Sequence, residues 1–168
     1  LLGFTLLCIY GVPVLLAIVW RRGRNFQSIT AEKKTSRSQI SFKIVDVCMM
    51  NGLESILKLG CYIILFSMLA RLLIRIPCPS SFVTYLSVGL LEMTNGIALV
   101  TSDLSLPVLM RYLSVLCFLS FGGLSGAAQT ESMILDSGLS FWNYLKAKLL
   151  TTAFVVCLAA GYFILPGH

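Results

Sequence analysis

Apolar runs alternate with short polar stretches along most of this chain. Runs with little or no charge cover residues 1–20, 59–73, 81–102, 104–121 and 141–165. A helix needs about 20 apolar residues to cross a bilayer, and the core helices of soluble domains have shorter apolar runs. The pattern therefore predicts an all-α, polytopic membrane helix bundle in a cell membrane, with the lipid bilayer as its first partner.

The composition supports a membrane protein and argues against a soluble one. The chain has 168 residues, of which 57% are hydrophobic and 12% are charged, whereas about 25% is charged in soluble domains. Its net charge is +6, but seven of its 13 Lys and Arg residues lie between residues 21 and 43. The positive-inside rule explains such a cluster. We therefore expect a cytoplasmic basic loop over residues 21–43 and no nucleic-acid partner.

The two ends of the chain predict an orientation. The first run ends at Trp20 and is followed by two arginines, an aromatic and basic edge typical of a membrane boundary. We expect residues 1–20 to be a transmembrane helix whose last residue faces the cytoplasm. The last run begins beside Trp142, Lys146 and Lys148, so it is expected to start on the cytoplasmic side as well.

Three apolar runs separate these two inner points, and they cannot all be simple crossings. An odd number of crossings would leave the chain on the wrong side, so at least one run is expected to be re-entrant. The candidates are the run over residues 81–102 and the glycine-opened run that follows Phe121. Ahead of both, the stretch after residue 43 predicts an amphipathic helix leading into the membrane, or half of a hairpin, with Glu54 and Lys58 paired at i, i+4.

A polar stretch opened by glycines occupies residues 121–139. The glycines are Gly122, Gly123 and Gly126, and the polar side chains that follow are Gln129, Thr130, Glu131 and Ser132. Glycine permits a helix break, and broken helices with polar side chains at membrane depth hold solutes in many secondary transporters. The spacing of Gly122 and Gly126 equally fits close packing of an unbroken helix. Break and packing are therefore both open, and the four polar residues are candidate solute ligands.

The middle of the run over residues 81–102 is polar too. It contains Glu92, Thr94, Asn95 and Gly96. A carboxylate at the centre of a membrane helix costs about 2.5–3.5 kcal/mol on insertion scales, which makes Glu92 a functional candidate. The alternative is a structural role, as an interhelical hydrogen bond or a partner for Arg111. We expect Glu92, Thr94 and Asn95 to bind solute and Gly96 to mark a second helix break.

Catalysis and metal binding receive no support from the sequence. The chain has no His/Asp/Ser set, no paired metal ligands and no phosphate-binding glycine motif. Its six cysteines form no CxxC pair and most lie within apolar runs, as small buried hydrophobic residues do. We therefore predict that the protein is not an enzyme and carries no metal or cofactor.

Several motifs together resemble a known family. Tyr62-Ile-Ile-Leu-Phe-Ser is followed by Gly89-Leu-Leu-Glu-Met-Thr-Asn-Gly and then by Phe121-Gly-Gly-Leu-Ser, with Ala128-Gln129 after it. In this order they resemble the C-terminal half of sporulation integral membrane proteins of the YlbJ type, in the nucleoside-recognition or Gate domain group. Gln129-Thr130-Glu131 is also similar to the hairpin motif with which concentrative nucleoside transporters hold a nucleoside.

The resemblance implies a Gate-like membrane domain over residues 44–168 and a multi-pass protein of the bacterial cytoplasmic membrane, used in spore formation. It implies a transporter-like half with inverted repeats and hairpins. Members of the family are about twice as long as this chain, so the resemblance also implies a missing N-terminal half, or a homo-oligomeric partner that replaces it.

Two functions are consistent with these features. The first is a secondary transporter or permease domain for a small polar solute, nucleoside-like or a small aromatic acid. Glu92 and Glu131 would then bind the solute or exchange a coupling ion, Na⁺ or H⁺. The second is a membrane assembly or scaffold protein that packs through its glycines and transports nothing.

Overall fold

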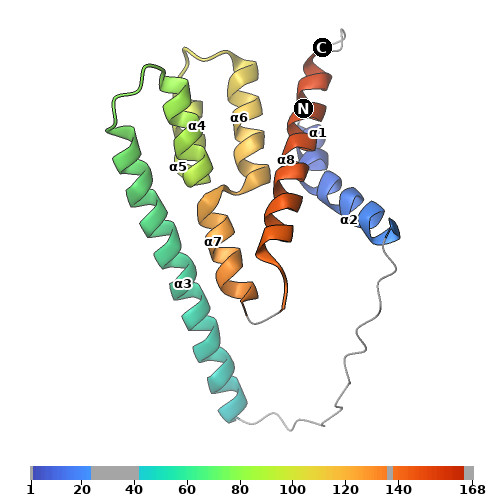
Figure 1. Cartoon of the computed structure of the whole chain (residues 1–168). Helices are drawn as coiled ribbons and strands as arrows, with labels where there is room; N and C mark the ends of the chain where they lie inside the picture. Colours follow the sequence, from blue (N-terminus) through green and yellow to red (C-terminus); the bar gives the residue numbers. More distant parts are fainter. Residues whose placement is uncertain (1, 24–41, 136–137, 165–168) are drawn as a thin grey trace.

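The computed structural model describes residues 2–23, 42–135 and 138–164, and within these ranges the regular structure is entirely helical. This confirms the all-α prediction. The elements are α1 (Leu2–Leu6), the π-helix η1 (Leu7–Gly11), α2 (Val12–Gly23), α3 (Phe42–Ile74), α4 (Ser81–Leu91), α5 (Met93–Ser102), α6 (Val108–Phe121), α7 (Gly123–Ile134) and α8 (Phe141–Ile164). Figure 1 shows them arranged as a helical bundle.

Three stretches in the described part of the chain are long and apolar enough to cross a membrane. They are Phe42–Ile74, Val108–Ile134 and Phe141–Phe163. Large hydrophobic side chains point outward from them, such as Ile64, Leu72 and Leu158. Contiguous apolar surface of this extent is unusual on a soluble monomer and is what a lipid solvent requires. The chain is a membrane protein built on three candidate transmembrane helices.

One run turns back on itself instead of crossing. The helices α4 and α5 are packed side by side and joined at Glu92, so that they form a helical hairpin (Figure 1). The 11 residues of α4 rise about 16 Å, close to half of a hydrocarbon core of about 30 Å. The hairpin begins on the side where α3 ends, and an arm of this length starting at the membrane surface would bring its tip to about mid-depth. Of the two re-entrant candidates, this is the one that returns.

The glycine-opened run is a broken crossing. The helices α6 and α7 follow one another across the bundle and together make the candidate span Val108–Ile134 (Figure 1). Their junction is at Gly122, where the backbone has φ 82° and ψ 3°. The helix α6 has 14 residues and rises about 21 Å, so this break also lies inside the membrane rather than at its surface.

Two glycines let the arms of the hairpin touch. A Cβ atom added to Gly96 of α5 would lie 2.1 Å from the Cα of Gly89 in α4, and one added to Gly89 would lie 2.2 Å from Cζ of Phe118. Such distances are possible only without side chains. Phe118 of α6 is fully buried and covers this contact. The hairpin is therefore held together, and against α6, through glycine.

The turn from α5 to α6 is closed by Asp103. Its Oδ1 accepts hydrogen bonds from the amide of Ser105 at 2.9 Å and from the Ser105 hydroxyl at 2.6 Å. These two donors lower the pKa of Asp103 below its ordinary value. Pro107 follows as the N-cap of α6, a position at which its missing amide leaves no hydrogen bond unmade.

The first helix contains a π segment. Pro13 has no amide to donate to the carbonyl four residues back, and its ring crowds that carbonyl, so the preceding turn widens into η1. The side chains of Cys8 and Val12 pack into a buried cluster with Val155 of α8. The apolar stretch Leu7–Val19 is one of the shorter apolar helices, not one of the three candidate spans, so a full crossing here stays a prediction.

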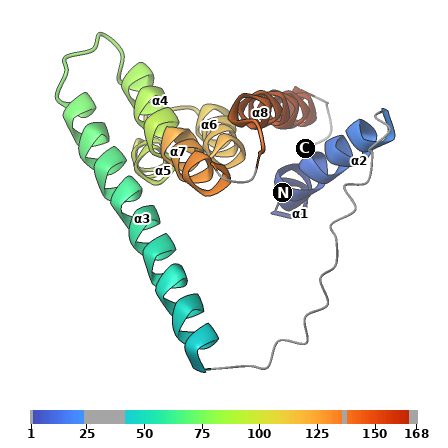
Figure 2. The same cartoon turned by 60° about the horizontal axis from the view of Figure 1, so that its bottom comes forward.

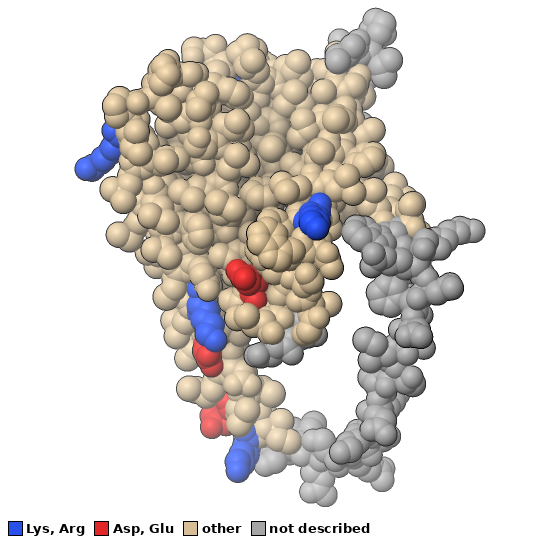
Figure 3. Space-filling view, in the orientation of Figure 1, with Lys and Arg blue, Asp and Glu red and all other residues tan. Residues whose placement is uncertain are grey.

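The helix α3 is continuous over 33 residues. The expected amphipathic segment after residue 43 is therefore neither a separate helix nor half of a hairpin, but the first part of the same helix. It carries the predicted pair, with Lys58 Nζ 2.7 Å from Glu54 Oε1. Figure 2 shows this first part of α3 extending beyond the other described helices. Charged side chains gather there and near α7, while the other half of this face is almost free of charge (Figure 3).

The glycine contact in the hairpin gives a testable prediction. We expect Gly96→Ala to destabilise the protein by at least about 1–3 kcal/mol, because the new methyl group must displace the backbone of Gly89. Gly52→Ala is the matched control, since a Cβ there meets nothing within 4 Å. Thermal unfolding of the purified protein in detergent measures both. Equal unfolding temperatures for the two variants would contradict the close packing of α4 and α5.

Candidate functional site

Glu92 forms the tip of the hairpin and caps α5. Its backbone is extended, with φ −143° and ψ 114°, and it is only 3% exposed. Its carboxylate accepts hydrogen bonds from the amides of Thr94 at 3.2 Å and Asn95 at 2.9 Å, and from the Thr94 hydroxyl. A negative group is favoured at a helix N-terminus, where the amides have no helical partner. The carboxylate therefore satisfies backbone donors that lipid could not.

Thr94 and Asn95 both contact the Glu92 carboxylate at the start of α5. Asn95 also connects the hairpin to α3, because its Nδ2 donates to Ser67 Oγ at 3.1 Å. The side-chain oxygen of Asn95 can also accept a hydrogen bond. The structure thus brings together a buried carboxylate, an exposed and a half-buried hydroxyl, and a half-buried amide at the hairpin tip. Glu92 makes its hydrogen bonds within its own hairpin, not with Arg111.

The second break is formed by two consecutive glycines with positive φ, 82° at Gly122 and 70° at Gly123. The Gly122 amide donates to Phe118 O at 2.8 Å and closes the last turn of α6. Side chains rarely tolerate this left-handed backbone. Of the two alternatives for these glycines, the break is confirmed.

The hairpin tip packs against this break. A Cβ atom added to Gly123 would lie 3.2 Å from the amide nitrogen of Met93 and 3.3 Å from Leu91 O. Four helix ends therefore meet at one place: the end of α4, the start of α5, the end of α6 and the start of α7. Helix starts carry partial positive charge and helix ends partial negative charge, so polar backbone groups of both signs lie together where the tip meets the break.

The C-terminal end of α6, at the break, is stabilised by a side chain of α8. Lys148 Nζ donates to the backbone oxygen of Ser120 at 3.2 Å. The break at Gly122 interrupts the helical hydrogen bonds of the last carbonyls of α6. A cation at a helix C-terminus is favoured for the same electrostatic reason as an anion at the N-terminus. Lys148 is thus the counterpart of Glu92.

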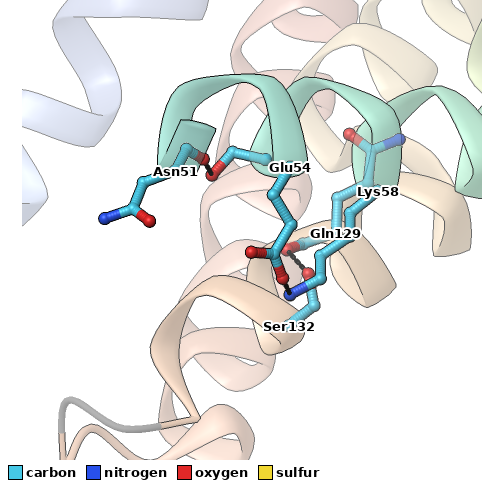
Figure 4. Close-up of polar contacts among 6 residues, drawn as sticks. Asn51, Glu54, Lys58, Gln129 and Ser132 are labelled. Atoms are coloured by element: carbon cyan, nitrogen blue, oxygen red, sulfur yellow. Dashed lines mark hydrogen bonds and ion pairs between the residues drawn. The ribbon is translucent and has the colours of Figure 1, made fainter. Parts of the chain in front are cut away.

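The predicted solute ligands on α7 make hydrogen bonds within α7 and to α8, and none of these bonds involves the hairpin tip. Gln129 Nε2 donates to Ser125 Oγ at 3.2 Å, and the Ser132 hydroxyl donates to Gln129 O at 2.8 Å. Thr130 Oγ1 donates to Gly126 O at 2.9 Å and lies 3.2 Å from the Tyr144 hydroxyl of α8. The helices α7 and α3 are in contact, and Figure 4 shows Gln129 and Ser132 of α7 beside the Glu54–Lys58 pair of α3.

The expectation that two acids are sheltered together is wrong for Glu131. Its side chain is exposed, whereas Glu92 is buried. Glu131 shares a face of α7 with the buried Gly123 and Ala127, but it lies one turn beyond Ala127 and two turns beyond Gly123, where that face is no longer covered. Only one of the two carboxylates is enclosed by neighbouring helices.

Two of the four predicted hinge glycines are not at breaks. Gly96 lies inside α5, where it makes the contact with Gly89, and the break itself is at Glu92. Gly126 lies inside α7, and a Cβ there would meet nothing within 4 Å. Gly122 and Gly123 are the two at a break. The sequence around the breaks does not show which glycines are needed for a left-handed backbone, as Gly122 and Gly123 are, and which for close helix packing, as Gly96 is.

Sequence reasoning missed several residues that the site uses. In the sequence Ser67 belongs to an apolar run, Gly89 to a motif and Lys148 to an interface segment, and none of the three is predicted as a site residue. Lys148 carried a usable signal, since it lies six residues inside the apolar run that Trp142 opens. Among the described residues no group of three His, Cys, Asp or Glu is arranged to hold a metal ion.

The positive φ at Gly122 gives a second prediction. Gly122→Ala should destabilise the protein by about 1–2 kcal/mol, the usual strain of a left-handed residue with a Cβ. Gly126→Ala is the control and should be neutral or stabilising, because alanine favours a helix interior over glycine by about 1 kcal/mol. Chemical unfolding in mixed micelles compares them. A larger loss of unfolding free energy in Gly126→Ala than in Gly122→Ala would instead favour close helix packing as the role of these glycines.

Comparison of the chain with protein-family models, with curated proteins and with solved structures finds no match.

Proposed function

We propose that this chain is the solute-holding part of a secondary transporter for a small polar solute. The observation that carries the proposal is the meeting of two interrupted helices, with Gly123 at the break of α6–α7 against Leu91–Met93 at the hairpin tip. Secondary transporters use such interrupted helices to expose backbone dipoles near the bilayer midplane. A bundle that only packs through apolar surfaces has no need of them.

The chemistry of the tip indicates the class of solute. Asn95 offers an amide, Thr94 and Ser67 offer hydroxyls, and Glu92 offers a carboxylate with two oxygens. Amides and hydroxyls both donate and accept hydrogen bonds. This set fits a neutral or weakly charged molecule with several hydrogen-bonding groups, such as a nucleoside. A small aromatic acid is the other candidate from the sequence.

The carboxylate of Glu92 also suits a coupling role. Helix ends and unwound carbonyls coordinate Na⁺ or H⁺ in transporters with interrupted helices, and the ends of α4 and α6 lie at this tip. A cation bound here would be near the only enclosed acid of the described chain. We therefore include Na⁺ or H⁺ as the coupling ion.

The sequence resemblance agrees with this proposal. It relates the two motifs that form the tip and the break, Gly89–Gly96 and Phe121–Ser125, to the YlbJ-type proteins of the Gate domain group. We accordingly propose a bacterial cytoplasmic membrane protein with a place in sporulation. A second half of the transporter, from a further segment or a second copy, would complete the solute site.

Uptake into proteoliposomes tests the proposal. We expect Glu92→Gln to lower the uptake of labelled uridine or benzoate at least tenfold, because the amide keeps an acceptor oxygen for capping α5 but loses the charge. Asn95→Ala should lower uptake similarly, by removing a solute contact and the bond to Ser67. Asp46→Asn on the exposed start of α3 is the matched control.

Unfolding temperatures measured on the same preparations separate transport from folding. The proposal requires Glu92→Gln to insert and to unfold near the wild-type temperature while transport is lost. Wild-type uptake in both Glu92→Gln and Asn95→Ala would remove the hairpin tip from transport. A wild-type protein that takes up no probe and binds none in a thermal-shift screen would favour the assembly role instead.

A further inference from the structure

A large groove lies on the other side of α6 from the hairpin. Its volume is about 1360 Å³, and its walls come from α1, η1 and α2, from the end of α6 and from the first half of α8. This exceeds the roughly 300–1,000 Å³ of most small-molecule pockets. Apolar side chains supply most of the wall, such as Leu6, Ile9, Leu16 and Leu150. The groove suits a long apolar molecule better than the polar solute proposed for the hairpin tip.

One charged side chain lines this groove in the described part of the chain. Of the described residues that line it, Lys148 alone is charged, and no Asp or Glu is among them. An ammonium group has three donors, and one of those of Lys148 is directed to Ser120 O. Asn143, Tyr144 and Thr151 line the groove near Lys148 on α8. The groove thus combines apolar walls with one cationic, hydrogen-bonding end.

The position of Lys148 along α8 places this end near a membrane surface. The helix begins at Phe141, and the exposed ring of Trp142 is of the type that marks the interface. Lys148 follows six residues later, about 9 Å further along the axis. This end of the groove thus lies between the interface that Trp142 marks and the break at Gly122, on the side expected to be cytoplasmic.

We propose that this groove binds one anionic phospholipid of the cytoplasmic leaflet, with its phosphate at Lys148 and an acyl chain along the apolar wall. Basic pockets between membrane helices on the cytoplasmic side bind anionic headgroups. A zwitterionic lipid is disfavoured, because none of the described lining residues is an acid that could receive its ammonium group. The charge of the groove therefore selects the headgroup, and its apolar walls select a lipid over a soluble anion.

The bound lipid also touches the broken helix. Lys148 contacts the carbonyl of Ser120, two residues before the break at Gly122. A phosphate at Lys148 shares the ammonium with that carbonyl and orders the end of α6 from the side opposite the hairpin. The lipid is thus a structural partner of the break, and its binding does not depend on transport.

Retention of lipid by the purified protein tests the proposal. The protein is incorporated into vesicles of phosphatidylcholine with a minor share of phosphatidylglycerol, extracted in mild detergent and analysed by native mass spectrometry. We expect one tightly held phosphatidylglycerol per chain in the wild type. Lys148→Gln should lower its retention at least tenfold, and Lys148→Arg should keep it. Lys146→Gln is the matched control, because Lys146 is exposed on the same helix and does not line the groove.

A second pair of variants tests the groove without changing charge. Ala147→Phe places a ring in the groove and should also abolish retention, whereas Ala153→Phe, at an exposed position of α8 outside the lining, should not. Circular dichroism confirms that the variants remain helical. Wild-type retention in both Lys148→Gln and Ala147→Phe would overturn the proposal. Equal retention of the two lipids by the wild type would overturn it as well, as would a groove filled by a second copy, seen as a dimer that Ala147→Phe makes monomeric.

Discussion

The need to satisfy backbone groups inside a bilayer governs this structure. A helix interrupted at mid-depth leaves amides and carbonyls without partners where no water can reach them. The protein answers with a small number of hydrogen bonds. Glu92 accepts from the first amides of α5, its own amide donates to Val88 O at 2.8 Å, and Lys148 donates to Ser120 O. Both breaks are stable because side chains replace the missing helical bonds.

Glycine also allows the interrupted helices to touch one another. Gly89 and Gly96 allow α4 and α5 to meet at backbone distance, and Gly123 allows the break of α6–α7 to reach the hairpin tip. Phe118 then fills the space that the absent side chains leave. The same residues therefore provide close packing and expose the backbone dipoles of four helix ends. In a membrane, where burial of apolar surface gives helices little reason to associate, such contacts carry much of the stability.

The sequence predicted the class of fold and the two polar segments, because charge and glycine inside apolar runs are strong signals in lipid. It did not predict which segment returns, since a hairpin and a broken crossing have similar composition over this length. It also grouped Glu92 with Glu131, because the sequence does not show where along α7 the hairpin tip makes contact; that contact is at Gly123, two helical turns before Glu131. Gly96 and Gly89 show the same limit: their role appears only when two helices are placed together.

Glu92 and Lys148 show how charge can be accommodated in such a bundle without an ion pair between them. Each lies at the helix end whose partial charge is opposite to its own, the anion at the start of α5 and the cation at the end of α6. Neither therefore requires the other as a partner, and each keeps capacity for a ligand of its own. Because the two are approached from different sides of α6, one can serve a polar solute at the hairpin tip while the other serves a lipid phosphate in the groove. A single pair of helix breaks can in this way connect a solute site with the surrounding membrane.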